Sequence, residues 1–387
     1  MSNLKENTSS AMKEDFKFLY TALLKHPSML IEAKMKNSFE ELYQSKLDEV
    51  FSYDSLIDAA TELTLFFQDG HTNIEVPYTA QDYCIPLHCT WDDSDSRLIL
   101  IEKYDEIPAN AQIIGINGIS IEEIIALLSK RIPHENCYLV KSRLVGYPYQ
   151  NYHLFSNMNL KYLFGVKEKY RISFMVKGEV IEKQCCLKKY DGFLDFTDDS
   201  DFITYEVQNN KIILHLNACI LNEKYKMMLE KLAKLCKEGH ITAFVLDLSH
   251  NYGGNSAVID EFIKYINIEK FRRYEMIDFS TGEAKQVTNR REFVNNPRKS
   301  ICFPNDMYCR VSCHTFSSAR TFAVTLKDNG IARIIGTNTG GKPNSYGMPR
   351  KYQMPNSKLR FRVSTSYFLR PDDSMDKEIT LEADRVE

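Results

Sequence analysis

The chain has 387 residues, of which 43% are hydrophobic and 26% charged, and its formal net charge is −3. This length exceeds one ordinary hydrophobic core, so we expect two or three domains of a soluble globular protein. The near-neutral charge, without a long run of Lys and Arg, argues against nucleic acid as a partner, and no apolar stretch is long enough to span a membrane.

The first residues and the cysteines indicate the compartment and argue against common cofactors. No apolar region of a secretory signal is present at the start, so we expect a cytoplasmic protein. Ten cysteines without a CxxC pair are typical of reduced thiols. Cys309, Cys313 and His314 form a CxxxCH cluster, but it lacks a second ligand pair, and we therefore expect neither a metal nor another cofactor.

Residues 1–79 form a predominantly helical segment. Apolar residues recur at helical spacing between residues 13 and 67, and the pattern ends abruptly at Asp69-Gly70, which predicts a turn. His71 follows the turn and precedes an alternating stretch that predicts a strand. A lone histidine at such a junction is usually a loop residue bonded to backbone, so its position alone assigns it no function.

Two further regions follow. Residues 80–200 contain short apolar or alternating runs between turn signals, of which Asn117-Gly118 is a strong one, and they predict a small β-rich domain. From Tyr205 onward, strand–helix–strand units have the length that gives parallel strand pairs. We therefore expect a layered α/β core over residues 201–387, with short antiparallel additions.

Two glycines follow a strand of the buried type that ends near Asp247. Gly253 and Gly254 allow backbone amides to approach a ligand closely, and at the start of a helix such amides form an anion site. In acyl transfer this site would be an oxyanion hole. An ordinary glycine turn fits the same residues, whereas the spacing of a nucleotide-binding loop is absent.

A second turn leads into a helix at Ser317. Strand, turn, helix, strand and loop are predicted in this order over residues 309–347, and Asn329-Gly330 ends the helix. A serine in the first turn of a helix lies in a field that favours negative charge, which suits a nucleophile. Serine is also a preferred N-cap, and the position taken alone favours the cap.

These stretches together resemble one protein family. VLDLSHNYGGNS, followed by TFSSARTFAVTLKDNGIARIIGTNTGGK, is similar to the tail-specific, C-terminal-processing serine proteases and their tricorn-like members, peptidase family S41. The resemblance covers residues 205–387 well and LTLFFQDGHT more weakly, and residues near 90–130 resemble a degraded PDZ-like module. It implies an α/β core of the ClpP/crotonase type, preceded by the helical segment and the PDZ-like domain.

The resemblance also implies roles for particular residues. Ser317 matches the nucleophile of the family. The oxyanion donors of the family fall on Gly253, Gly254 and the backbone amide of Ser318.

Two residues match the bases that different branches of the family use. The tricorn-like branch uses the histidine of DGHT, here His71, together with an acid near the C-terminus. The Ser–Lys branch uses a lysine, which matches Lys342. We favour His71, because a lysine must be desolvated to be neutral at pH 7, whereas histidine titrates in this range.

The chain departs from the family pattern in two places. Arg320 stands where the Ser–Lys branch has an acidic residue, and the segment DKEITLEAD lacks the glycine-rich ending of that branch. Glu378 and Asp376 lie nearest to the position of the third, orienting acid, and we assign this role to Glu378. We expect Arg320 to be exposed.

The sequence therefore predicts a serine peptidase that hydrolyses extended or unfolded polypeptides through an acyl-enzyme. The sequence does not fix the oligomeric state, and a homo-oligomer is possible. One alternative is a peptide-binding scaffold with an eroded site, which the two departures favour. Another is a crotonase-like acyl-thioester enzyme, in which the glycine amides hold an oxyanion and Ser317 need not be a nucleophile. A covalent serine probe separates the peptidase from both alternatives.

Overall fold

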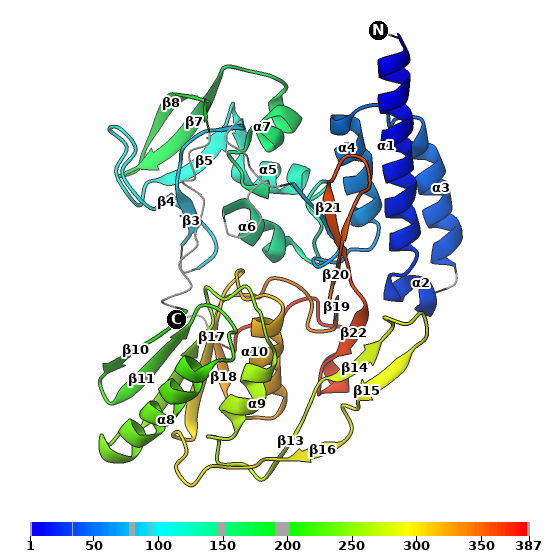
Figure 1. The fold of residues 1–387 in the computed structure, drawn as a ribbon. Helices are drawn as coiled ribbons and strands as arrows, with labels where there is room; N and C mark the ends of the chain where they lie inside the picture. The colour runs from blue at the N-terminus through cyan, green and yellow to red at the C-terminus, as the bar shows by residue number, and fades with distance from the viewer. Residues whose placement is uncertain are drawn as a thin grey trace.

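A computed structural model describes residues 2–32, 34–76, 82–92, 94–145, 152–189 and 202–384 (Figure 1). The domain boundaries expected between residues 79 and 80 and between 200 and 201 lie outside these ranges. Three large clusters of buried apolar side chains are present among the described residues. One of them joins residues of the N-terminal helices to residues between 354 and 363.

Helices form the N-terminal part, and helix α1 already begins at Ser2. The elements are α1 (Ser2–Leu23), α2 (Pro27–Ile31), α3 (Met35–Leu47), α4 (Tyr53–Leu65) and β1 (Asn73–Glu75). Aromatic side chains make much of their core; for example, the rings of Tyr20 and Tyr43 stack with centroids 4.1 Å apart. The turn that carries His71 lies between α4 and β1.

The middle part is built on one antiparallel sheet. Its elements are β2 (Tyr83–Cys84), β3 (Cys89–Trp91), β4 (Leu98–Leu100), β5 (Gln112–Ile116), β6 (Ile119–Ser120), α5 (Ile121–Leu128), α6 (Cys137–Val145), α7 (Asn157–Phe164), β7 (Lys169–Val176), β8 (Glu179–Cys186) and β9 (Lys188–Lys189). The strand order is β3-β4-β5-β7-β8, with β6 beside β5. Strands β5 and β6 flank the predicted turn at Asn117-Gly118.

The third part holds a mostly parallel sheet. Its elements are β10 (Ile203–Gln208), β11 (Lys211–Leu216), α8 (Glu223–Glu238), β12 (Ala243–Asp247), α9 (Ala257–Ile263), β17 (Asp306–Val311), α10 (Ser318–Asp328) and β18 (Arg333–Gly336). In the order β10-β11-β12-β17-β18, only the β10–β11 pair is antiparallel. The expectation of an α/β fold is confirmed, whereas its ClpP/crotonase detail stays a prediction.

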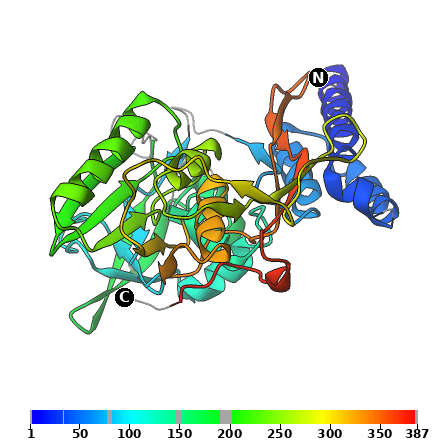
Figure 2. The ribbon, with the colours of Figure 1, turned by 90° about the horizontal axis from the view of Figure 1, so that it is seen from below.

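Short strands of the C-terminal region tie the parts together. They are β13 (Lys270–Arg272), β14 (Glu275–Asp278), β15 (Lys285–Thr288), β16 (Phe293–Asn295), β19 (Ser345–Gly347), β20 (Arg350–Gln353), β21 (Arg360–Val363) and β22 (Ser366–Leu369), followed by the 3-10 helix η3 (Asp373–Met375). Strand β21 pairs with β1, and Figure 2 shows the orange-red C-terminal strands beside the blue N-terminal helices. This pairing holds the turn after α4 against the core, although the two segments are far apart in sequence.

Candidate active site

Ser317 occupies a strained turn between β17 and α10. Its backbone has φ 54° and ψ −126°, a conformation that non-glycine residues rarely adopt. Its side chain makes no N-cap hydrogen bond, so the N-cap interpretation of this serine is wrong. Strain of this kind persists only where surrounding contacts enforce it and is concentrated at functional sites.

His71 is fixed by the turn that follows α4. The carboxylate of Asp69 accepts the backbone N–H of His71 at 2.9 Å and the hydroxyls of Thr72 and Ser364 at 2.7 and 2.6 Å. The imidazole stacks on Phe316, with ring centroids 4.6 Å apart. These contacts place Nε2 of His71 at 2.9 Å from Oγ of Ser317.

The two ring nitrogens of His71 have different surroundings. For Nε2 to accept the proton of the Ser317 hydroxyl, the ring must carry its own proton on Nδ1. Nδ1 is buried and has no hydrogen-bond partner among the described residues. Two carboxylate oxygens lie near it, Oδ1 of Asp69 at 3.6 Å and Oε1 of Glu135 at 3.9 Å.

A second histidine supports Asp69 from the N-terminal helices. Nδ1 of His26 accepts the backbone N–H of Ser28, so Nε2 carries the proton and donates it to Oδ2 of Asp69 at 3.2 Å. Burial lowers the pKa of His26, and Asp69 only partly opposes this. Burial also disfavours the charged form of Asp69, but contacts with His26 and His71 outweigh it and hold the pKa of Asp69 well below its usual range. Asp69 is therefore an ionised carboxylate that accepts hydrogen bonds from several elements, and His26 is a neutral donor.

Two backbone amides beside Ser317 are available to a ligand. The carbonyl between Gly253 and Gly254 accepts the N–H of Cys219 at 2.9 Å, so in this trans peptide the N–H of Gly254 points the opposite way. The carbonyl of Ser317 accepts the N–H of Thr321 at 2.9 Å, which leaves the N–H of Ser318 directed out of the helix start. Neither amide has an acceptor within the described part of the chain.

The loop that carries Gly253 and Gly254 is fixed by a buried side chain of its own. The side chain of Asn251 is fully buried, and its carbonyl oxygen accepts the N–H of Gly253 at 2.8 Å. Gly253 is therefore not free to donate to a ligand, and of the two expected glycine donors only Gly254 is free. The hydroxyl of Ser318 donates to the carbonyl oxygen of Gly254 at 2.8 Å and so fixes the loop to the start of α10.

The remaining predicted residues lie at various distances from Ser317. The ammonium of Lys342 has no hydrogen-bond or ion-pair partner among the described residues, while its backbone N–H donates to Glu135 at 2.7 Å. Glu378 forms an ion pair with Arg370 rather than with His71. The expectation that Arg320 is exposed is wrong: this residue is 2% exposed and donates to Glu135 at 3.0 Å.

One group of side chains in the described residues has the spacing of metal ligands. It consists of Asp69, His71 and Glu135, whose donor atoms all lie within 4.8 Å of one another. The oxygens of Asp69 already accept several hydrogen bonds, and Nε2 of His71 faces Ser317. These contacts suit proton transfer better than coordination of an ion.

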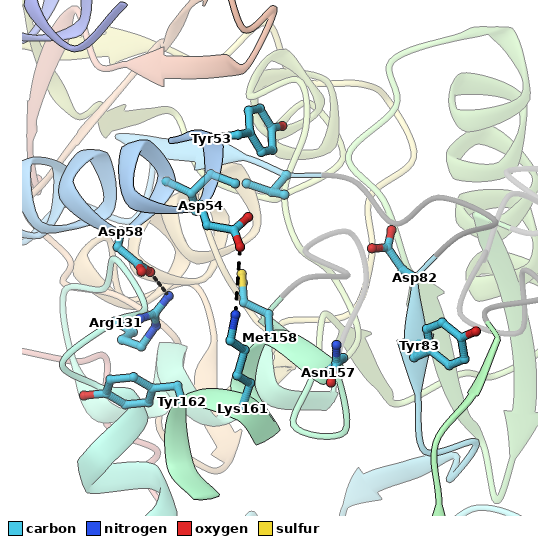
Figure 3. A pocket seen from close by; sticks show the side chains of 12 residues that line it. Tyr53, Asp54, Asp58, Asp82, Tyr83, Arg131, Asn157, Met158, Lys161 and Tyr162 are labelled. Atoms are coloured by element: carbon cyan, nitrogen blue, oxygen red, sulfur yellow. Dashed lines mark hydrogen bonds and ion pairs between the residues drawn. The ribbon is translucent and has the colours of Figure 1, made fainter. Parts of the chain in front are cut away.

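A separate cavity of about 380 Å³ lies beside α4 and α7 (Figure 3). Four of its charged side chains form two pairs: Arg131 bonds Asp58 at 2.8 Å, and Lys161 lies 3.9 Å from Asp54. Neither Ser317, His71 nor Glu135 lines this cavity. Among the described helices, none is both long and apolar enough to cross a membrane.

Comparison with solved structures identifies the fold as that of a protease. Mature CPAF aligns with a TM-score of 0.71 at 13% identity, covering 98% of this chain and 93% of that chain. Mature CPAF complexed with lactacystin gives 0.68 at 12%, covering 98% and 94%. The photosystem II D1 C-terminal processing protease gives 0.51 at 12%, covering 97% and 93%.

The sequence comparison supplies the family. Residues 212–384 match the family model of peptidase family S41. A comparison with curated proteins gives no significant match. Family and fold together support a peptidase, that is, a hydrolase of peptide bonds.

Proposed function

We propose that the chain is a serine peptidase in which Ser317 is the nucleophile and His71 the general base. The observation that carries this proposal is the 2.9 Å contact between Nε2 of His71 and Oγ of Ser317, two residues 246 positions apart. Such a contact between a serine in a strained turn and a histidine held by a buried carboxylate is the arrangement that nucleophilic catalysis needs.

The reaction follows from this geometry. His71 takes the proton of Ser317 as Oγ attacks the scissile carbonyl carbon, and the carbonyl oxygen becomes an oxyanion. The amides of Gly254 and Ser318 donate to that oxyanion. Collapse of the intermediate breaks the C–N bond, and His71 returns the proton to the leaving amine. Water then attacks the acyl-enzyme by the same route and regenerates Ser317.

The contacts favour His71 over Lys342 as the base. The backbone N–H of Lys342 donates to Glu135 at 2.7 Å. Among the described residues, the hydroxyl of Ser317 contacts the imidazole of His71 and forms no hydrogen bond with the ammonium of Lys342. Lys342 therefore acts in this proposal through its backbone.

The substrate proposed is an extended or unfolded polypeptide. Strands β3 and β8 are the edges of the middle sheet, and a peptide binds such an edge through main-chain hydrogen bonds without need for a folded epitope. In this proposal, residues 80–200 form a PDZ-like domain that presents substrate to the core over residues 201–387.

The proposal is tested by incubating the protein with a reduced, carboxymethylated polypeptide and following new amino termini. Hydrolysis is expected for the wild type and for Lys342→Ala, and it should be lost in Ser317→Ala and His71→Ala. Turnover by Ser317→Ala would refute the nucleophile. Binding of the polypeptide without cleavage by any variant would favour the scaffold interpretation, and thioester turnover would favour the crotonase-like one.

A further inference from the structure

Two buried atoms of complementary chemistry face each other beside the catalytic pair without a partner. Nδ1 of His71, which carries the proton in the productive tautomer, makes no hydrogen bond to any described residue. Oε1 of Glu135 is likewise buried and accepts none from the same part of the chain. The two atoms are 3.9 Å apart. Buried polar atoms in native proteins are nearly always paired, so a donor and an acceptor left facing each other indicate a bond that forms during the working cycle.

The rest of the Glu135 side chain is firmly held. Its second oxygen, Oε2, accepts the guanidinium of Arg320 at 3.0 Å and the backbone N–H of Lys342 at 2.7 Å. The side chains of Glu135 and Arg320 are 3% and 2% exposed. Arg320 lies in the first turn of α10, three residues after Ser317, so the anion is anchored to the helix that presents the nucleophile.

The neighbouring residue fixes the loop that carries Glu135. The side-chain amide of Asn136 donates to the carbonyls of Thr339, Gly341 and Ile379 at 2.9–3.2 Å. Its oxygen accepts the N–H of Gly341 at 3.1 Å and, as a cap of α6, the N–H of Leu139 at 3.0 Å. The loop before α6 is thereby tied to the loop before β19.

Asp69 lies closer to Nδ1, but most of its hydrogen-bonding capacity is already used. Its Oδ1 accepts the backbone N–H of His71, and its Oδ2 accepts three donors, from His26, Thr72 and Ser364. Asp69 therefore sets the backbone of His71, while Oε1 of Glu135 has its hydrogen-bonding capacity unused.

We propose that Glu135 is the positioning acid of the site: it accepts the Nδ1–H of His71, holds the productive tautomer and stabilises the imidazolium as Ser317 loses its proton. A movement of about 1 Å brings the pair to hydrogen-bond distance. This inference rests on the proposed function. It assigns to a loop of the middle part the role that the sequence pattern placed near the C-terminus at Glu378.

Several titratable groups surround the pair. Those near His71 and Glu135 include His26, Asp69, His134, Arg143, Tyr274, Arg320, Lys342 and Tyr367. His26 and His134 have pKa values that burial lowers, so both are neutral at pH 7. The guanidinium of Arg320 is the cation in direct contact with Glu135.

The test is the rate at which a fluorophosphonate labels Ser317, measured as a function of pH. Glu135→Gln keeps the shape but removes the charge, and we expect a 10²- to 10⁴-fold slower rate, on the order of the general-base contribution, with the midpoint of the profile moved to lower pH. Glu275→Gln is the matched control, because Glu275 is a half-buried glutamate beside Arg290. It should label at the wild-type rate.

The outcomes separate the inference from the function. The inference is overturned if Glu135→Gln labels at the wild-type rate with an unchanged pH profile. It is also overturned if Glu378→Gln, and not Glu135→Gln, slows the labelling of Ser317 by 10²- to 10⁴-fold. If the wild type itself is not labelled, the proposed function has failed instead.

A second measurement does not depend on the stability of a variant. In wild-type protein labelled with ¹⁵N-histidine and phosphonylated on Ser317, the proton of His71 should reside on Nδ1 and resonate far downfield. A proton on Nε2 alone would overturn the inference, even if Glu135→Gln did not fold.

Discussion

A single added methyl group at Gly253 should displace Ser317. Gly253 has φ +106°, and a Cβ at this position would lie 2.7 Å from Cβ of Ser317 and 3.0 Å from the backbone nitrogen of Ser318. Ordinary carbon–carbon contacts are about 3.5–4.0 Å, so the turn must shift by roughly 1 Å.

The magnitude follows from two separate effects. Backbone strain at positive φ costs about 1–2 kcal/mol, and overpacking a rigid site adds about 1–3 kcal/mol, so Gly253→Ala should lower the free energy of unfolding by about 2–5 kcal/mol. A misplacement of about 1 Å at a reacting centre costs on the order of 10²-fold in rate. We therefore expect Gly253→Ala to fold with reduced stability and to react with a fluorophosphonate about 10²-fold more slowly.

Gly330 offers a matched control. It also has positive φ, +64°, but a Cβ there would meet nothing within 4 Å. Gly330→Ala should cost about 1–2 kcal/mol, from strain alone, and should label at the wild-type rate. Denaturant titration and labelling kinetics of both variants decide the matter. Wild-type labelling by Gly253→Ala, or an equal loss in Gly330→Ala, would refute the reasoning.

Three further results are expected. Burial lowers the pKa of both His153 and His314 to about 3, so between pH 6.5 and 3 only the unfolded chain binds these two protons, and the free energy of unfolding should fall by about 2.7 kcal/mol per pH unit as the pH drops; urea titrations at pH 5.5 and 4.5 that give equal values would contradict this. Asp69→Asn places an amide N–H against the Nε2–H of His26 and should lower the free energy of unfolding by about 3–5 kcal/mol. A loss below 1 kcal/mol in denaturant titration would show that Asp69 is not a central hydrogen-bond acceptor of this site. Lys342→Ala keeps the backbone amide and should label close to the wild-type rate, and a loss as large as that of His71→Ala would make the lysine the base.

The order of the elements was open to prediction from sequence because it depends on local patterns. The helical region, the β-rich region and the α/β core each have their own periodicity, and Ser317 and His71 stand within motifs that can be recognised by their neighbours. Helical spacing is visible only from residue 13, whereas α1 begins at Ser2, because residues 2–12 are mostly polar and show no apolar face.

The surroundings of His71 and Ser317 were harder to predict from sequence. Whether Arg320 is buried depends on a partner in another part of the chain, Glu135, and no spacing rule connects positions 185 residues apart. The same holds for the contact between Glu135 and His71. Which glycine amide is free depends on the orientation of one peptide group, which Asn251 and Cys219 set through tertiary hydrogen bonds.

The most direct test of the central claim is to label the purified protein with a fluorophosphonate and map the modified residue by mass spectrometry. We expect one modified residue, Ser317, and loss of labelling in His71→Ala. Modification of another serine, or undiminished labelling of Ser317 in His71→Ala, would contradict it.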